Sequence, residues 1–149
     1  MGCMRQFCTF SLGELSFGVD VRSIQEVILH HEMTRVPTAA PVVRGLINLR
    51  GQIVMAIDPR RRLGLPPGRS EAESINVILR TEDRPVSLLV DAVGDILDLG
   101  EEQMEPPPET VRGEIRGLIL GIYKLPDRLL LILDTERMAD FDAATESAA

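Results

Sequence analysis

Residues 44–58 read RGLINLRGQIVMAID, and this stretch decides the fold more than any other part of the chain. Two strongly apolar runs, residues 42–49 and 52–57, meet at Arg50-Gly51. Short apolar runs broken by a glycine predict two strands that meet at a bend. The bend carries an arginine, whose planar guanidinium can hold one carboxylate with two hydrogen bonds. A charged side chain at a corner of the core is therefore the first feature to explain.

The rest of the chain continues as short apolar runs separated by turn residues. Further strands are expected at residues 7–12, 15–19, 34–37, 75–80, 86–90, 96–99, 115–123 and 129–133, with a turn at 91–95. Only short helices are expected, one over 21–28 after Asp20 and one from Asp134 through Ala139. The sequence therefore predicts an all-β fold.

The two halves of the chain echo one another. Matching segments occur in the same order, at residues 17–28 and 88–97, 44–47 and 116–119, and 53–58 and 129–134. The proline-rich connector 65–73 separates them. We expect one domain over 5–140, made of two similar β lobes at about 5–66 and 74–140, and a frayed tail at 141–149.

Composition and charge limit the functional class. The formal net charge is −7, and aromatic residues make up only 3% of the 149 residues, with no tryptophan. An acidic chain is a poor candidate for binding nucleic acid, and the dense basic run Arg60–Arg62 is interpreted as a solvated strand end in preference to a phosphate contact. No apolar run approaches the roughly 20 residues that a membrane helix needs. We expect a cytosolic protein.

The sequence offers no constellation typical of an enzyme. His30 and His31 are the only histidines, and they are adjacent, which disfavours joint ligation of one metal. Cys3 and Cys8 have neither zinc nor redox spacing, so we expect one tail thiol and one buried thiol. Phosphate-loop, dinucleotide and nucleophile-elbow patterns do not occur. We therefore expect no enzymatic activity, no metal and no cofactor.

Four stretches together resemble the CheW-like domain family. They are FSLGELSFGVDVRSIQEVI at 10–28, RVPTAAPVVRGLINLRGQIVMAIDPRRRLG at 35–64, SLLVDAVGDIL at 87–97 and EIRGLILGIYKLPDRLLLILDTERM at 114–138. The resemblance runs from about Gln6 to about Ala139. The family often has proline where Met55 stands and leucine where Pro59 stands, which leaves the subtype open.

This resemblance implies a fold and a function. The fold would be two interlocked SH3-like, five-stranded β-barrels with an apolar groove between them. The function would be that of a stand-alone scaffold that couples the cytoplasmic tips of chemoreceptors to the regulatory domain of a histidine kinase in bacterial arrays. Self-association in arrays is left open, and neither nucleic acid nor direct membrane insertion is expected. Two other hypotheses remain open, a homo-oligomeric adaptor without a kinase partner and a small ligand-binding or enzymatic β-barrel.

The resemblance also implies residues of the partner-binding surface, namely Ile24, Glu26, Arg44, Gly45 and Arg50. Val27, Asn48, Leu49 and Val90 complete the expected partner-binding set. Four residues of this set are expected to expose apolar side chains in the groove for a receptor helix: Ile24, Val27, Leu49 and Val90. The alternative is that all four belong to the core. Arg50 is expected to contact a partner. The alternatives are that it only ties the two lobes together, or that it pairs with a buried carboxylate of its own chain, such as Asp20 or Glu26.

Overall fold

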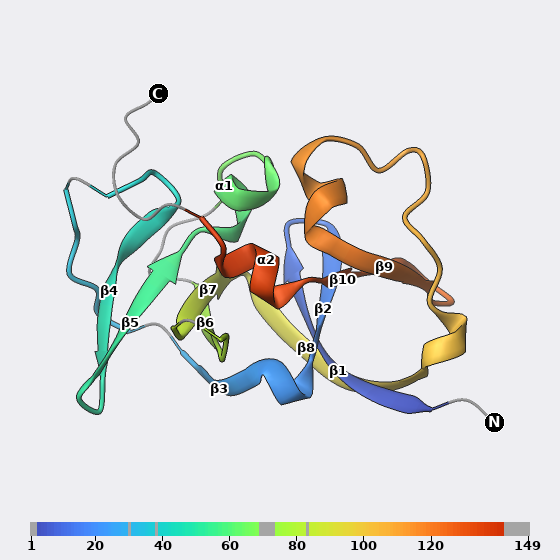
Figure 1. The fold of residues 1–149 in the computed structure, drawn as a ribbon, viewed down its shortest axis with the longest axis horizontal. Helices are drawn as coiled ribbons and strands as arrows, with labels where there is room; N and C mark the ends of the chain where they lie inside the picture. The colour runs from blue at the N-terminus through green and yellow to red at the C-terminus, as the bar shows by residue number, and fades with distance from the viewer. Residues whose placement is uncertain (1–2, 30, 38, 69–73, 83, 142–149) are drawn as a thin grey trace.

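The computed structural model describes residues 3–29, 31–37, 39–68, 74–82 and 84–141 (Figure 1). The strands are β1 (Met4–Leu12), β2 (Leu15–Asp20), β3 (Ile24–Ile28), β4 (Val43–Leu49), β5 (Gln52–Ile57), β6 (Ile75–Leu79), β7 (Val86–Val90), β8 (Ala92–Gly100), β9 (Ile119–Lys124) and β10 (Leu129–Leu133). The short helices are α1 (Pro59–Leu63) and α2 (Thr135–Ala139), with 3-10 turns η1 (Val21–Ser23), η3 (Glu101–Gln103) and η4 (Gly113–Leu118).

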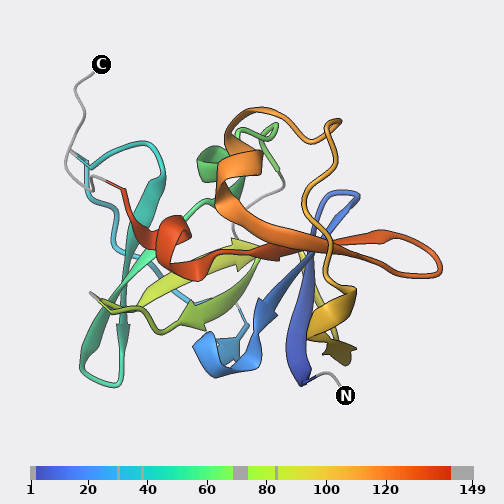
Figure 2. The ribbon, with the colours of Figure 1, turned by 45° about the vertical axis from the view of Figure 1, so that its right-hand side comes forward.

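The strands form two five-stranded sheets, each of which is one lobe of the molecule (Figure 2). Lobe A has the strand order β8-β1-β2-β10-β9, and lobe B has the order β3-β6-β7-β5-β4. Lobe B is therefore one continuous segment, residues 24–90, and lobe A is built from the two ends of the chain. The chain crosses between the lobes at η1 and again at Asp91, between β7 and β8.

The predicted lobe boundaries, 5–66 and 74–140, are therefore wrong. Strand β2 pairs in parallel with β10, and β5 pairs in parallel with β7, so the centre of each sheet joins the two halves of the sequence. The predicted duplication survives in another form. Exchanging β1 with β6, β2 with β7, β3 with β8, β4 with β9 and β5 with β10 converts one strand order into the other.

Each lobe holds a buried glycine where a connecting segment crosses its edge strand. A Cβ atom on Gly45 would lie 2.8 Å from the carbonyl oxygen of Thr34, and one on Gly121 would lie 2.7 Å from that of Glu105. Thr34 and Glu105 each bridge to the residue after the glycine in question. Gly121 is thus the structural counterpart of Gly45. The sequence match pairs Gly45 with Gly117 instead, but Gly117 lies in η4 and not in a strand.

This register predicts the effect of adding a methyl group at each glycine. Gly45→Ala and Gly121→Ala should each lower the free energy of unfolding by about 1–3 kcal/mol, because the new Cβ meets backbone oxygen that has no room to move. Gly117→Ala is the control, since a Cβ atom there would meet none of the described residues within 4 Å apart from its chain neighbours. Urea unfolding measures all three. A loss at position 117 equal to that at position 45 would contradict the register.

Several local predictions hold and others need correction. The strands at 42–49 and 52–57 are confirmed within one residue as β4 and β5, and Asp134 caps α2 by accepting a hydrogen bond from the backbone N–H of Arg137 at 3.1 Å. The expected helix over 21–28 is wrong, because only η1 is helical and β3 follows it in an antiparallel pair with β6. β-Branched residues such as Ile24 and Val27 favour the strand.

Three further segments differ from expectation. The turn expected at 91–95 belongs mostly to β8, which extends back to pair with β1. The strand expected over 115–123 begins only at Ile119, because η4 precedes it. Residues 34–37 contribute a single bridge, at Thr34, in place of a strand. Parts of the connector 65–73 and of the tail 141–149 lie outside the described residues.

The largest hydrophobic cluster lies between the two lobes. It joins Phe10, Phe17 and Val19 of lobe A to residues of lobe B such as Leu88 and Val90. Smaller clusters fill each barrel, with Phe7, Tyr123, Leu130 and Ile132 in lobe A and Ile47, Leu49, Val54, Ala56, Ile78 and Leu89 in lobe B. Central strands are therefore buried on both faces, one toward the barrel interior and one toward the other lobe.

Candidate functional site

The turn between β4 and β5 is a two-residue loop with an unusual occupant. Arg50 has φ 55° and Gly51 has φ 88°, the paired positive values of a tight hairpin turn. The side-chain oxygen of Asn48 accepts a hydrogen bond from the N–H of Gly51 at 2.9 Å. Arg50 is the one non-glycine residue with positive φ in the described part of the chain, and such a conformation typically costs on the order of 1 kcal/mol. Arginine therefore occupies a position where glycine or asparagine would adopt the backbone conformation more easily.

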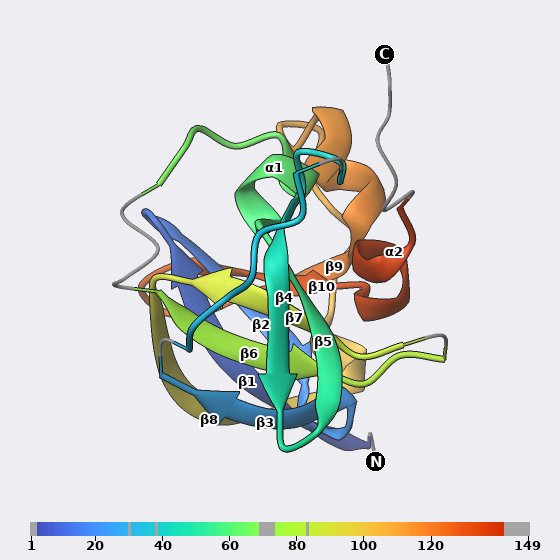
Figure 3. The same ribbon diagram turned by 90° about the vertical axis from the view of Figure 1, so that its left-hand side faces the viewer.

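The Arg50 side chain forms an ion pair with Glu26 of β3. Figure 3 shows the turn between β4 and β5 at the bottom of the view, on the side where β3 lies. Its Nη2 donates to the Glu26 carboxylate, and the two side chains are 68% and 24% exposed. Nearby, Gln25 donates from Nε2 to Oε1 of Gln52 at 3.3 Å. Strands β3 and β4 are the two edges of the lobe B sheet, so these contacts draw the edges together and help to close the barrel.

The pairing decides between the two internal roles considered for Arg50. Both Arg50 and Glu26 belong to lobe B, so the pair does not tie the lobes together, whereas the expected pairing with a carboxylate of its own chain is present, with Glu26 as the partner. Asp20, the other carboxylate considered, is held instead by Arg22, whose guanidinium donates to it at 3.1 and 2.9 Å, and this hydrogen bonding lowers the pKa of Asp20. Arg50 remains largely open to solvent and to a partner.

The ion pair makes the corner sensitive to acid. Hydrogen bonding from Arg50 lowers the pKa of Glu26 below its ordinary value of 4.5. A carboxyl whose pKa is lowered by folding stabilises the fold above its unfolded pKa, and that contribution is lost as the pH falls through the folded pKa. We expect the pKa of Glu26 to rise toward 4.5 in an Arg50→Asn variant, as followed by the NMR shift of its side-chain carboxyl carbon. An unchanged titration would show that the pair does not form in solution.

The structure corrects part of the predicted apolar surface. Val90 is 0% exposed and Leu49 is 5% exposed, so neither lines an open groove, and Gly45 is buried as well. Val90 lies on β7, at the centre of lobe B and against lobe A, while the Leu49 side chain points into the lobe B barrel. Ile24 is half-buried against the core between the lobes. Of the four predicted groove residues, only Val27, at 40% exposed, offers a large apolar surface to solvent.

Strand pairing adds a residue that the sequence reasoning missed. Ile53 is 58% exposed and lies opposite the exposed Asn48 in the β4–β5 hairpin. The sequence carries no signal for it, because residues 53–57 are all apolar. The structure places Ile53 outside, because Val54 and Ala56 point into the barrel and strand residues alternate between faces. We use the name corner surface for five residues at this end of lobe B: Glu26, Val27, Asn48, Arg50 and Ile53.

Arg44 does not join the corner surface. It lies six positions before Arg50 along the β4 hairpin arm, about 20 Å away at 3.3 Å per strand residue. It lines a hollow of about 340 Å³ with Asp58, Arg60, Arg61 and the start of the connector. A second hollow, of about 580 Å³, runs along the outer side of β4 from His31 to Asn48 and borders the corner surface. Arg44 and Arg50, both in the predicted set, thus lie at opposite ends of β4.

Comparison with known proteins now bears on this architecture. Residues 6–142 match a family model described as CheW-like domain. The chain belongs to the CheW-like domain family. The Chemotaxis protein CheW of Klebsiella aerogenes is 30% identical over 134 residues, which cover 90% of this chain and 81% of the relative. That of Bacillus subtilis is 30% identical over 135 residues, which cover 91% and 86%.

A solved structure of the CheW-like family has the same architecture. The crystal structure of scaffolding protein TtCheW from Thermoanaerobacter tengcongensis matches with a TM-score of 0.84 and 27% sequence identity, covering 99% of both chains. The predicted CheW-like resemblance and the all-β fold of two five-stranded lobes are confirmed. Among the described residues, no helix is long and apolar enough to cross a membrane, and no group of three potential ligands could hold a metal ion.

Proposed function

We propose that this CheW-like chain is a non-enzymatic scaffold that joins a chemoreceptor to a histidine kinase in a bacterial chemosensory array. Membership of the family supports the proposal, as do relatives named for chemotaxis and a structural neighbour named as a scaffolding protein. The partners we propose are the helical cytoplasmic tip of the receptor and the regulatory domain of the kinase. The protein would work in the cytoplasm, held at the membrane by its receptor partner.

One observation carries the proposal to specific residues, namely the strained and exposed Arg50 within the corner surface. Backbone strain persists where the side chain has a use that compensates for it. Val27 and Ile53 supply apolar contact for one face of a receptor helix, and the Arg50 guanidinium supplies a fork for a partner carboxylate. This combination of exposed apolar area and a planar cation fits a protein–protein contact, in which arginine is often a dominant residue.

Binding to a receptor fragment tests this assignment. The probe is a purified helical hairpin from the cytoplasmic tip of a receptor, titrated against the full chain with fluorescence detection. Ile53→Asp should weaken binding at least about tenfold, as loss of a central apolar contact does in other interfaces. Leu120→Asp is the matched control, because Leu120 is 54% exposed on β9 of lobe A, away from the corner surface. Equal binding by both variants and the wild type would refute the corner surface as the receptor site.

A further inference from the structure

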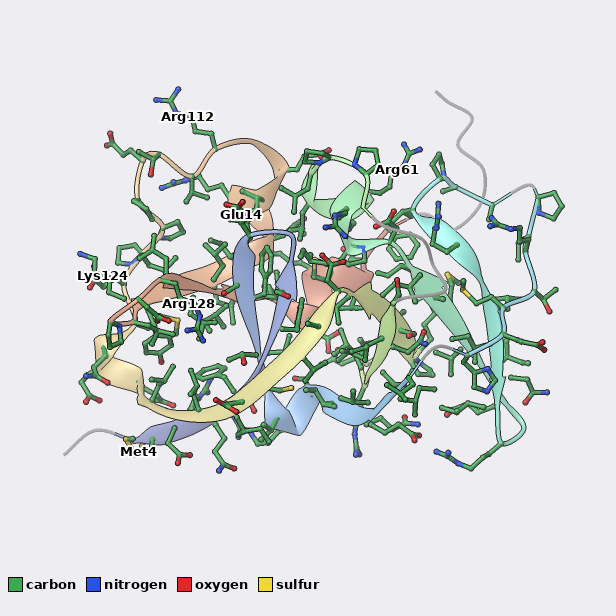
Figure 4. All side chains as sticks on the ribbon, turned by 180° about the vertical axis from the view of Figure 1, so that it is seen from behind. Met4, Glu14, Arg61, Arg112, Lys124 and Arg128 are labelled. Carbon is green, nitrogen blue, oxygen red and sulfur yellow. The ribbon has the colours of Figure 1, made fainter. Side chains whose placement is uncertain are left out.

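Three consecutive arginines, Arg60–Arg62, occupy a short helix between the lobes. The sequence suggested a solvated strand end, but α1 begins here after Asp58, whose carboxylate accepts the N–H of Arg60 at 3.0 Å. Gly64, with φ 73°, ends the helix. A single helical turn sends successive side chains in different directions, about 100° apart. Arg60 and Arg62 hydrogen-bond to other parts of the protein. Arg61 is exposed and points outward (Figure 4).

Arg60 binds Asp91, the residue at which the chain passes from lobe B to lobe A. Its two terminal nitrogens donate to the two carboxylate oxygens of Asp91, both at 2.9 Å. The side chains are only 14% and 20% exposed. The same carboxylate accepts the backbone N–H of Gly13 at 2.7 Å, in the β1–β2 turn of lobe A. One arginine of lobe B thus fixes Asp91, which in turn binds the β1–β2 hairpin of lobe A. Hydrogen bonding to Asp91 raises the pKa of Arg60.

Arg62 binds lobe A at a second point, the end of helix α2. Its guanidinium donates to the carbonyl oxygens of Arg137 at 2.6 Å, Asp140 at 2.9 Å and Met138 at 3.3 Å. These carbonyls end α2, which follows the lobe A strand β10, and the last carbonyls of a helix lack partners within it. A cation at this position satisfies them and complements the negative end of the helix dipole.

We propose that Arg60 and Arg62 form a clasp that fixes the angle between the two lobes. The core between the lobes supplies non-directional attraction, which tolerates small rotations of one lobe on the other. Paired hydrogen bonds from two guanidinium groups, at separate points, remove that freedom because their geometry is directional. The inference rests on the proposed function in one respect, since a rigid angle would let a partner on lobe B position a partner on lobe A. Arg60 and Arg62 are positioning residues in this scheme.

The three arginines supply their own control for a test. Spin labels are placed in the full chain on Gln52→Cys and Lys124→Cys, which lie at the hairpins of lobe B and lobe A, in a Cys3→Ser background. Cys8 is buried and stays in place. Arg60→Met and Arg62→Met should each widen the distribution of label distances measured by double electron–electron resonance. Arg61→Met should leave the distribution as narrow as in the parent chain.

Two outcomes of this experiment test the clasp and the proposed function separately. Distributions for Arg60→Met and Arg62→Met that remain as narrow as that of Arg61→Met would overturn the clasp. If Arg60→Met does not fold, Asp91→Asn tests the same contact, with an acceptor oxygen retained for Gly13. The receptor-binding titration is run on the parent chain and on the same variants. Widened distributions in the variants, together with a parent chain that does not bind receptor, would support the clasp and refute the proposed function, so that the two failures are distinct.

Discussion

Val90→Asp is expected to lower the free energy of unfolding by on the order of 4 kcal/mol, because it places an unpaired charge in a fully buried site. Val90 is 0% exposed and lies in the cluster that joins the two lobes. Val27→Asp is the matched control, with the same change of side chain at a position that is 40% exposed. Its expected loss is no more than about 1 kcal/mol, as is typical of surface substitutions.

Urea unfolding of the two variants measures the contrast directly. The result distinguishes a Val90 in the core between the lobes from a Val90 in a groove open to a receptor. In an open groove Val90 would be accessible, and Val90→Asp would lower the free energy of unfolding only slightly. Similar midpoints for Val90→Asp and Val27→Asp would mean that the lobes do not pack against each other through Val90. A variant at position 90 is therefore unsuitable for binding studies, because it would lose binding through unfolding whether or not Val90 contacts a partner.

Arg50→Asn is expected to abolish receptor-dependent control of the kinase while changing stability little. Asparagine accepts the positive φ of this turn more readily than arginine, which offsets the loss of the exposed ion pair with Glu26. Folding should therefore stay within about 1 kcal/mol of the parent chain. The function should be lost because the guanidinium fork is gone.

Arg50→Lys distinguishes charge from geometry at the same position. Lysine keeps the charge but cannot make two parallel hydrogen bonds to one carboxylate, so we expect it to recover little kinase control. Arg128→Asn is the control, because Arg128 forms a similar exposed ion pair with Asp127 in lobe A. Kinase activity is measured with purified receptor in membranes, with and without receptor ligand. Full control in the Arg50→Asn reaction would remove Arg50 from the partner-binding surface.

Local structure was largely predictable from the sequence, and the pairing of distant strands was not. The hairpin at Arg50-Gly51 and the cap at Asp134 follow from neighbouring residues. The parallel pairs β2–β10 and β5–β7 join strands far apart in the chain, and no local pattern encodes which distant strand is the partner. The internal echo revealed a duplication, but repeated segments alone do not show that the lobes interlock.

The errors at the candidate site have two origins. Val90 lies on β7, which is buried on both faces, so no alternation in the sequence shows which way its side chain points. Residues 53–57 are likewise all apolar, so the sequence does not show that Ile53 lies outside. Leu49 lies on the edge strand β4 next to the exposed Asn48, and alternation there would have placed it inside. The helix that carries the clasp could have been predicted, because Asp58 followed by Pro59 is a helix start signal directly before the three arginines. Their targets, Asp91 and the end of α2, are visible only in three dimensions.

Bridging of two partners by one chain is the central claim, and co-sedimentation tests it most directly. Membranes that carry the receptor are mixed with the regulatory domain of the kinase, with and without this chain, and then pelleted. The account predicts that the kinase domain pellets with the membranes only when the chain is present, and that Arg50→Asn removes it from the pellet. Kinase domain that pellets equally without the chain, or that stays in the supernatant while the chain itself is bound, would contradict the account.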